Sequence, residues 1–425
     1  MAVYRKRIAD SVLAEKLEGA GAVLIEGPKW CGKTTTAEQV AQSALYMSDQ
    51  DSFRRNLEIA DFKPSMLLEG AKPRLLDEWQ LAPKLWDAVR FAVDHGPGAG
   101  QFVLTGSTVP DDKRAEIQHT GTGRFSRLKM RPMSLWESGE STGTVSLGRL
   151  FDGSGFEGGA SSLSFGELAF LACRGGWPAA VALRGKIALD RAFDYLDAVT
   201  ESDISKADAV SRDPGLARGI MRSYARLQGT QAAVTVVRAD VASREGGGPS
   251  DDTVYSYLGA LKKIFVIEDM PAWCPDLRGK TPIRSGDTRY FVDPSIATAA
   301  LGVSPADLEN DLPTFGLVFE THAVRDLRAY AEALGGKVFH YLDKSGLECD
   351  AVVHLRDGRY GLVEMKLGGE VLIEKGAKSL ARLAEKIDTS KMKAPSFRMI
   401  VVADGACAYR RPDGTIVCPI GCLKD

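Results

Sequence analysis

The sequence predicts an α/β protein of about three domains, and three observations indicate this fold class. Short apolar runs alternate with amphipathic stretches over the first 135 residues, which is typical of a parallel sheet wound by right-handed crossovers. A glycine-rich turn follows the first apolar run at residues 27–34. The chain has 425 residues, enough for about three domains at roughly 150 residues each.

The composition is that of a folded globular protein, with 44% hydrophobic and 26% charged residues. Lys and Arg total 54 against 56 Asp and Glu, a net charge of −2, which excludes a uniformly basic nucleic-acid-binding surface and leaves only local patches. No apolar run is long enough for a transmembrane helix, and MAVYRKRIAD lacks the apolar core of a secretory signal. The seven scattered cysteines favour a reducing compartment. We therefore expect a cytoplasmic protein without a membrane partner.

Residues 1–137 are expected to form the first domain. Its predicted strands are the apolar runs AVLIEG (22–27), ALYMS (44–48), PRLLDE (73–78) and QFVLTGS (101–107). The intervening stretches KTTTAEQVAQSA and PKLWDAVRFAVDH carry apolar residues at helical spacing. This alternation predicts a parallel sheet with helical crossovers.

The turn after the first strand reads GPKWCGKT and matches G-x-x-x-x-G-K-[ST]. Its two glycines let the backbone wrap a phosphate so that consecutive N–H groups point inward. Lys33 would reach the β- and γ-phosphates, the Thr34 hydroxyl would bind Mg²⁺, and the helix that begins there adds its positive dipole end. The sequence therefore predicts a site for ATP and Mg²⁺. The expected nucleotide contacts are Gly27, Pro28, Lys29, Trp30, Cys31, Gly32, Lys33, Thr34 and Thr35.

A pair of acids ends the third predicted strand, in PRLLDEWQ. Asp77 at this position would hold Mg²⁺, directly or through water, and Glu78 would polarise the attacking water as the general base. The fourth strand ends in QFVLTGST, where Thr105 or Ser107 would place a hydroxyl beside the γ-phosphate, although Thr-Gly-Ser is also an ordinary turn. These residues predict hydrolysis of the bound nucleotide.

The stretch GTGRFSRLKMRPMS follows the fourth strand and contains two candidate arginines. Arg124 or Arg127 would stabilise charge on the transferring phosphoryl group, including that of a neighbouring subunit. An ordinary surface arginine is the open alternative for each.

Two further segments precede the C-terminal region. Residues 138–164 include DGSGFEGGASS, a composition that predicts a flexible linker or loop. Residues 165–305 are expected to be helical, ending in a winged helix formed by VRADVASREG, DDTVYSYLGALKKI and the strands FVIEDMPAW and TRYFVDPS. Thr253, Tyr255 and Ser256 would begin the recognition helix. Charges over 261–290 are nearly balanced, so DNA contact and a packing role both stay open.

Four of these motifs, GPKWCGKT, LLDEWQ, LTGST and GRFSRLKMRPMSLWE, together resemble the prokaryotic AAA-type ATPases that carry a C-terminal domain of uncharacterised function. The resemblance continues in family order through GGWP, YLDAVTESDI, TVYSYLGALKK, RYFVDPSIATAALG, FGLVFETHAVRDL and ECDAVV…LVEMK. It covers nearly the whole chain and implies ATP binding, ATP hydrolysis and a winged-helix middle. Trp30 and Cys31 depart from the smaller or more polar residues of many members, but both positions contribute mainly backbone.

Residues 306–425 predict a third unit with the order helix, three strands, helix, strand. Asp350 lies on one predicted strand, and Glu364 and Lys366 share a face of the next because alternate residues of a strand point the same way. This arrangement is similar to the D-x(n)-E-x-K core of restriction-endonuclease-like, or PD-(D/E)xK, nucleases. Asp350 and Glu364 would hold a second Mg²⁺ or Mn²⁺, with Lys366 and Glu320 as further catalytic groups. Such folds also serve as binding or structural modules, so cleavage stays open.

Two functions are consistent with these motifs. The first is an oligomeric ATPase that acts on DNA through the winged helix and the nuclease-like domain. The second is a nucleotide-switched signalling ATPase that binds a protein partner and has no nuclease activity.

Overall fold

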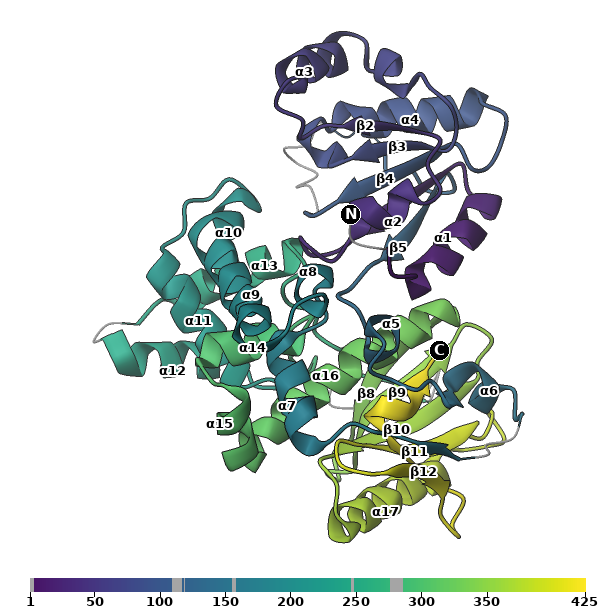
Figure 1. Cartoon of the computed structure of the whole chain (residues 1–425), viewed down its shortest axis with the longest axis vertical. Coiled ribbons are helices and arrows are strands. Elements are labelled where there is room, and N and C mark those ends of the chain that lie inside the picture. The colour runs from purple at the N-terminus through teal and green to yellow at the C-terminus, as the bar shows by residue number, and fades with distance from the viewer. Residues whose placement is uncertain (1–3, 109–116, 118, 155–157, 246–247, 276–285) are drawn as a thin grey trace. The chain divides into compact units, whose positions relative to one another are not determined.

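The computed structural model describes residues 4–108, 117, 119–154, 158–245, 248–275 and 286–425. The chain divides into two compact units (Figure 1). The first comprises residues 1–132, 202–212 and 259–265, and the second comprises residues 133–201, 213–258 and 266–425. Among the described residues, no helix is both long and apolar enough to cross a membrane.

The first unit is built on a parallel five-stranded sheet of order β2-β3-β4-β1-β5. Its strands are β1 (Ala22–Glu26), β2 (Ser43–Tyr46), β3 (Arg74–Asp77), β4 (Phe102–Gly106) and β5 (Phe125–Lys129). Its helices include α1 (Ile8–Gly19), α2 (Lys33–Glu38), α3 (Phe53–Phe62) and α4 (Lys84–His95). The central strands β1 and β4 are almost entirely buried, as continuous apolar runs are when helices cover both faces of a parallel sheet. The four predicted strands lie at their predicted positions.

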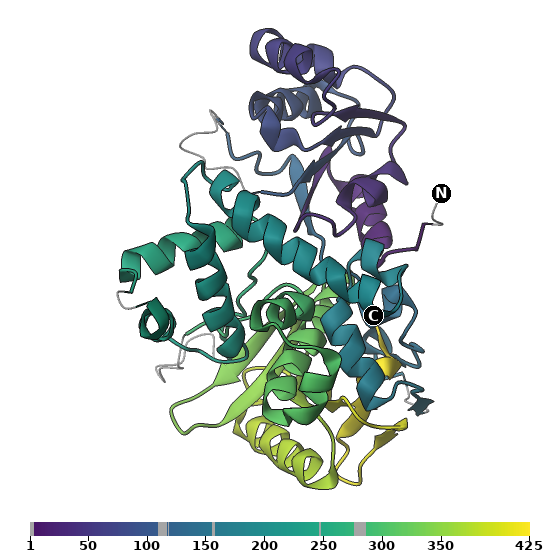
Figure 2. The ribbon, with the colours of Figure 1, turned by 60° about the vertical axis from the view of Figure 1, so that its left-hand side comes forward.

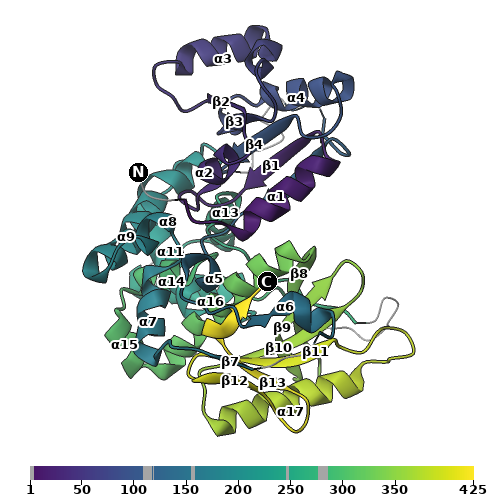
Figure 3. The same ribbon diagram turned by 45° about the vertical axis from the view of Figure 1, so that its right-hand side comes forward.

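The second unit contains a seven-stranded sheet of order β7-β12-β13-β11-β10-β9-β8 (Figure 3). The strands from its C-terminal segment are β8 (Gly336–Leu342), β9 (Glu348–Leu355), β10 (Tyr360–Lys366), β11 (Phe397–Val402), β12 (Cys407–Arg410) and β13 (Ile416–Pro419). Strands β8, β9 and β10 pair antiparallel, whereas β10, β11 and β13 run parallel. Helices α16 (Leu312–Ala333) and α17 (Glu370–Lys386) pack against the sheet. The element order agrees with the prediction for this region.

Residues 138–164, predicted as a Gly/Ser-rich linker or loop, contain short elements in the part that the structure describes, and their role as a linker stays a prediction. This stretch forms α6 (Leu147–Phe151) and two short strands, β6 (Val145–Ser146) and β7 (Gly159–Ala160). Strand β7 pairs with β12, and β6 pairs with β14 (Leu423–Lys424) at the end of the chain. Both strands are two residues long and their partners lie far away in sequence, so no local pattern indicates them.

The middle segment of the second unit is a bundle of helices (Figure 2). The helices α7, α9, α11 and α16 all pack against α14. Their bounds, with α15 included, are α7 (Phe165–Arg174), α9 (Gly185–Ala198), α11 (Pro214–Arg226), α14 (Pro294–Leu301) and α15 (Pro305–Asn310).

The predicted winged helix is formed only in part. Its two helices are present as α12 (Val234–Glu245) and α13 (Asp251–Lys263). In place of the two strands, the described residues form isolated antiparallel bridges between Ile267 and Phe291 and between Met270 and Thr288. Residues 276–285 of the predicted wing lie outside the described residues. The winged helix therefore stays a prediction.

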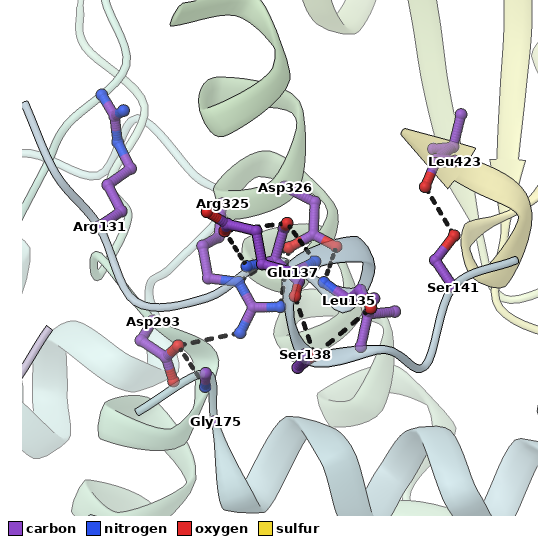
Figure 4. A network of polar contacts seen from close by, with 12 residues as sticks. Arg131, Leu135, Glu137, Ser138, Ser141, Gly175, Asp293, Arg325, Asp326 and Leu423 are labelled. Atoms are coloured by element: carbon purple, nitrogen blue, oxygen red, sulfur yellow. Dashed lines mark hydrogen bonds and ion pairs between the residues drawn. The ribbon is translucent and has the colours of Figure 1, made fainter. Parts of the chain in front are cut away.

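A buried charge network ties several segments of the second unit together (Figure 4). Arg325 on α16 pairs with Asp293 at 3.0 Å and with Asp326 at 2.7 Å, and all three side chains are at most 1% exposed. Asp326 also accepts a hydrogen bond from the backbone of Leu135, and Asp293 accepts one from the backbone of Gly176. One arginine thus links α16 to the start of α14, to the Gly-Gly-Trp-Pro turn and to the segment after residue 133.

Candidate functional site

The predicted phosphate-binding loop lies between β1 and α2, as the motif requires. Gly27 has a positive φ of 158°, and a Cβ atom at this position would lie 2.1 Å from the carbonyl oxygen of Met130. Gly32 adopts a left-handed conformation at the start of α2, which an L side chain rarely tolerates. Lys33 is 5% exposed, and its ammonium group donates a hydrogen bond to the carbonyl of Pro28 at 2.8 Å. The loop is therefore closed around its own lysine.

The two residues predicted to bind Mg²⁺ are in direct contact. The Thr34 hydroxyl donates to Oδ1 of Asp77 at 2.6 Å, and Asp77 is 5% exposed. Thr105 on β4 donates to the same carboxylate oxygen at 2.7 Å and accepts a hydrogen bond from the backbone N–H of Glu78. Since the Thr105 hydroxyl is engaged on both sides, it supports the two acids, and its expected contact with a phosphate stays a prediction. A hydroxyl and a buried carboxylate are hard oxygen donors that fit Mg²⁺.

Glu78, the predicted base, is held from two sides. Ser107 donates from its hydroxyl to Oε2 of Glu78 at 2.9 Å, and Gln80 donates from its amide nitrogen to the same oxygen. The sequence reasoning missed Gln80, although it follows Glu78 by two positions in the LLDEWQ motif. Glu78 itself has φ of 54°, a left-handed conformation that is uncommon for a residue with a side chain.

The predicted arginine fingers form ion pairs within the first unit. Arg124 lies 2.7 Å from Asp94 on α4, and Arg127 lies 2.7 Å from Glu26 at the end of β1. Their side chains are 44% and 56% exposed, respectively. The geometry does not favour one of them as the finger, and this role stays a prediction.

Two more contacts of the loop were not expected from the sequence. Arg7 is buried and donates to the backbone carbonyls of Cys31 and Arg131, both at 2.8 Å, so it links the loop to the chain beyond β5. Lys29 forms an ion pair with Asp203 at 2.6 Å. Asp203 belongs to the short segment 202–212 of the first unit and ends a π-helical turn at Val199–Asp203, a distortion found frequently at functional sites.

The acids and the lysine predicted in the C-terminal segment lie together. The ammonium group of Lys366 is 3.0 Å from Oδ2 of Asp350 and 2.6 Å from Oε2 of Glu364. Burial opposes the charge on Lys366, but the two carboxylates outweigh it and raise the pKa of its ammonium group. Oε1 of Glu364 is buried without a hydrogen-bond partner. An orphaned carboxylate oxygen beside a second carboxylate is compatible with a bound divalent cation.

Glu320 on α16 interacts electrostatically with Asp350 and Lys366, and it is hydrogen-bonded to a tyrosine of the middle segment. The Tyr290 hydroxyl donates to Oε1 of Glu320, and burial together with the charge of Asp350 raises the pKa of Glu320 to about 8. Burial and Asp350 also raise the pKa of Glu364. Within the described ranges, no group of three or more His, Cys, Asp or Glu side chains has the geometry of a metal site. The metal at Asp350 and Glu364 therefore stays a prediction based on two carboxylates.

The first part of the chain matches a known protein family. Residues 20–138 match the family model described as an AAA domain. This match supports an AAA-type P-loop ATPase domain in the N-terminal segment. The remainder of the chain matches two families described as domains of unknown function, DUF8612 over residues 166–307 and DUF4143 over residues 315–423.

Two relatives are similar to most of this chain at low identity. The chain is 24% identical over 392 residues to the uncharacterized proteins Mb2031c of Mycobacterium bovis and Rv2008c of Mycobacterium tuberculosis, covering 90% of this chain and 80% of each relative. Two solved structures are similar at low TM-scores. The Walker-type ATPase PABY2304 of Pyrococcus abyssi is 15% identical, with a TM-score of 0.41 over 70% of this chain and 96% of its own. The RuvB Holliday junction branch migration motor of Thermotoga maritima is 16% identical, with a TM-score of 0.25 over 61% of this chain and 88% of its own.

Proposed function

We propose that this protein is a Mg²⁺-dependent ATPase that works as a homo-oligomer on DNA. The observation that carries the ATPase proposal is the hydrogen-bonded series Thr34, Asp77, Thr105 and the Glu78 backbone. It holds the predicted metal ligands and the predicted base together beside the loop that carries Lys33.

Each residue has a distinct role in this proposal. Lys33 exchanges the Pro28 carbonyl for the β- and γ-phosphates, because an ammonium group binds a charged phosphate more strongly than a neutral carbonyl. Thr34 and Asp77 would hold Mg²⁺, which when bound neutralises charge on the phosphates. Glu78 accepts the proton of the attacking water, while Ser107 and Thr105 fix the acids on which this step depends.

Steady-state ATP hydrolysis and ATP binding in the presence of Mg²⁺ test these roles. Lys33→Ala is expected to lose both binding and turnover. Glu78→Gln is expected to retain ATP binding while turnover falls by about 100-fold or more, since general-base catalysis contributes roughly 10²–10⁴-fold. Lys378→Ala, which changes an exposed lysine of α17, serves as the control and should match the wild type. Unaltered turnover in Glu78→Gln would refute the assignment of the base.

For the C-terminal domain we propose a PD-(D/E)xK-like nuclease site at Asp350, Glu364 and Lys366, with Glu320 as an additional carboxylate. The contacts of Lys366 with both acids support this proposal. Branched, single-stranded and duplex DNA should be incubated with the protein and Mg²⁺ or Mn²⁺. Cleavage that is lost in Asp350→Ala and in Lys366→Ala supports the site, whereas identical behaviour of the wild type and both variants excludes it.

A nucleotide-switched ATPase without nuclease activity is the second candidate, and the Lys29–Asp203 ion pair favours it. A triphosphate beside Lys29 would compete with Asp203 for the ammonium group and so alter the 202–212 segment. Nucleotide-dependent oligomer size without DNA affinity, measured by sedimentation and by DNA titration, would support this candidate. DNA affinity that falls steeply with salt would support the first one, because phosphate contacts release counterions.

A further inference from the structure

We propose that Gln80 is a positioning residue for hydrolysis, which together with Ser107 fixes the Glu78 carboxylate and thereby sets the turnover rate without affecting nucleotide binding. This inference rests on the proposed ATP hydrolysis at Glu78. It assigns a role to a side chain that lies outside the phosphate-binding loop.

Three side chains form a closed triangle at the ends of β3 and β4. Oε2 of Glu78 accepts hydrogen bonds from the Ser107 hydroxyl at 2.9 Å and from the Gln80 amide nitrogen, and that nitrogen lies 3.4 Å from the Ser107 hydroxyl. Only the nitrogen end of the Gln80 amide can face the carboxylate, because the oxygen end is an acceptor. In the described part of the chain, no donor reaches Oε1 of Glu78, which leaves this oxygen for the proton of a water molecule.

The backbone explains why Gln80 can reach Glu78 at all. The left-handed φ of Glu78 ends β3 and turns the chain directly into the 3-10 turn η2 (Trp79–Leu81). This conformation is strained for a residue with a side chain, and the hydrogen bond from the Glu78 N–H to Thr105 helps to offset that strain. The turn returns the Gln80 side chain to the carboxylate two residues earlier.

The surroundings of Gln80 leave it little freedom. Trp79 is 3% exposed and lies against Trp86 with ring centroids 4.9 Å apart, so the turn is anchored in the core. On the other side, a Cβ atom at Gly106 would lie 3.3 Å from the Gln80 amide oxygen and 3.1 Å from the Trp79 indole nitrogen. Gly106 thus provides the space that the amide occupies, and a methyl group there would press on Gln80.

The contacts of Gln80 involve the predicted base and not the residues that would bind the nucleotide. The residues that would hold the nucleotide use other partners, Lys33 with the Pro28 carbonyl and Thr34 with Asp77. Removal of the Gln80 donor leaves the Glu78 carboxylate with one hydrogen bond instead of two, so it can rotate away from the attacking water. Because a displacement of about 1 Å can cost a catalytic group roughly 100-fold, we expect kcat to fall by about 10–100-fold and nucleotide affinity to stay unchanged.

The experiment compares Gln80→Met, which keeps the shape of the side chain and removes the donor, with the wild-type protein. The kcat and KM for ATP are measured together with the affinity for ADP. Gln50→Met, at an exposed glutamine outside the site, is the matched control. Gly106→Ala is a second variant that displaces the amide without removing it, and it is expected to lower kcat in the same way.

A double variant distinguishes positioning from a general structural effect. If Gln80 acts through Glu78, Gln80→Met lowers kcat in the wild type and has no further effect in Glu78→Gln. A kcat within twofold of wild type, a higher kcat, or an equal loss in both backgrounds would overturn this inference and leave the ATPase proposal standing. Absence of ATP hydrolysis by the wild-type protein would overturn both.

Discussion

Replacement of Arg325 by methionine is expected to destabilise the second unit strongly. The substitution preserves most of the aliphatic volume but removes the charge that compensates Asp293 and Asp326, both of which are fully buried. Breaking a buried ion pair from one side costs about 3–5 kcal/mol, since a charge is left uncompensated in a medium of low polarity. For a unit of this size, each kcal/mol lowers the melting temperature by roughly 2–4 °C, so we expect a decrease of about 10 °C.

The measurement is thermal unfolding followed by circular dichroism, supported by urea unfolding to obtain the free energy. Arg191→Met is the matched control, because Arg191 pairs with Asp194 on the surface with both side chains more than 40% exposed. An exposed pair of this kind contributes about 0–1 kcal/mol. A loss of less than 1 kcal/mol for Arg325→Met would refute the view that Arg325 compensates the charge of the two buried acids.

The pH dependence of this variant follows from Asp326. Burial raises the pKa of Asp326 to about 6 even with Arg325 present. Loss of the arginine raises it further, so the folded variant takes up a proton more readily than the unfolded chain as the pH falls. The destabilisation of Arg325→Met is therefore expected to be largest above pH 7 and smaller at pH 5.

Three further predictions concern single contacts. Gly27→Ala is expected to lose nucleotide binding, measured by ADP titration, because its methyl group would meet a carbonyl oxygen at 2.1 Å; Gly19→Ala, with open space around it, should bind normally. Thr105→Val removes the hydroxyl that joins the two acids ending β3, and we expect kcat for ATP to fall by about 10-fold or more; an unchanged kcat would contradict the supporting role. Burial opposes the charge of Asp343, but hydrogen bonds from a lysine of α17, a serine and the backbone outweigh it and lower the pKa of Asp343. Asp343→Asn should therefore be less stable at pH 7, and its deficit in unfolding free energy should shrink as the pH falls below about 4; a deficit that is constant with pH would contradict the ionic origin.

Much of the first unit could be predicted because its signals are local. The glycine-rich loop and the acids after β3 each follow a continuous apolar run, and parallel strands buried on both faces produce such runs. Strand β5 (FSRLK) was not predicted, because it is an edge strand whose exposed positions carry charge. The proximity of Lys366 to Glu364 followed from the alternation of side chains along a strand, whereas Asp350 was included because of the resemblance to the D-x(n)-E-x-K pattern.

The remainder depended on contacts that no local pattern encodes. Gln80 reaches Glu78 only because Glu78 adopts a left-handed φ, and sequence alone gives no reason to expect that conformation. The partners of Arg325 lie on two other elements, so the helical pattern of α16 indicates its burial but not its charge network. Strands β6 and β7 were not predicted because each is two residues long and pairs with a strand far away in sequence.

The interleaving of the two units has a consequence for biosynthesis. The first unit includes residues 259–265, which are translated about 130 residues after Pro132, and synthesis at about 5–20 residues per second puts roughly 7–27 s between them. Strand β6 waits still longer for β14, which follows it by about 280 residues (423 − 145). Neither unit can be completed as its own segment emerges, and β6 and β7 of the second unit stay unpaired until β14 and β12 have been translated. Slowing translation should then lengthen the period of chaperone dependence, the opposite of what a chain of consecutive domains would experience.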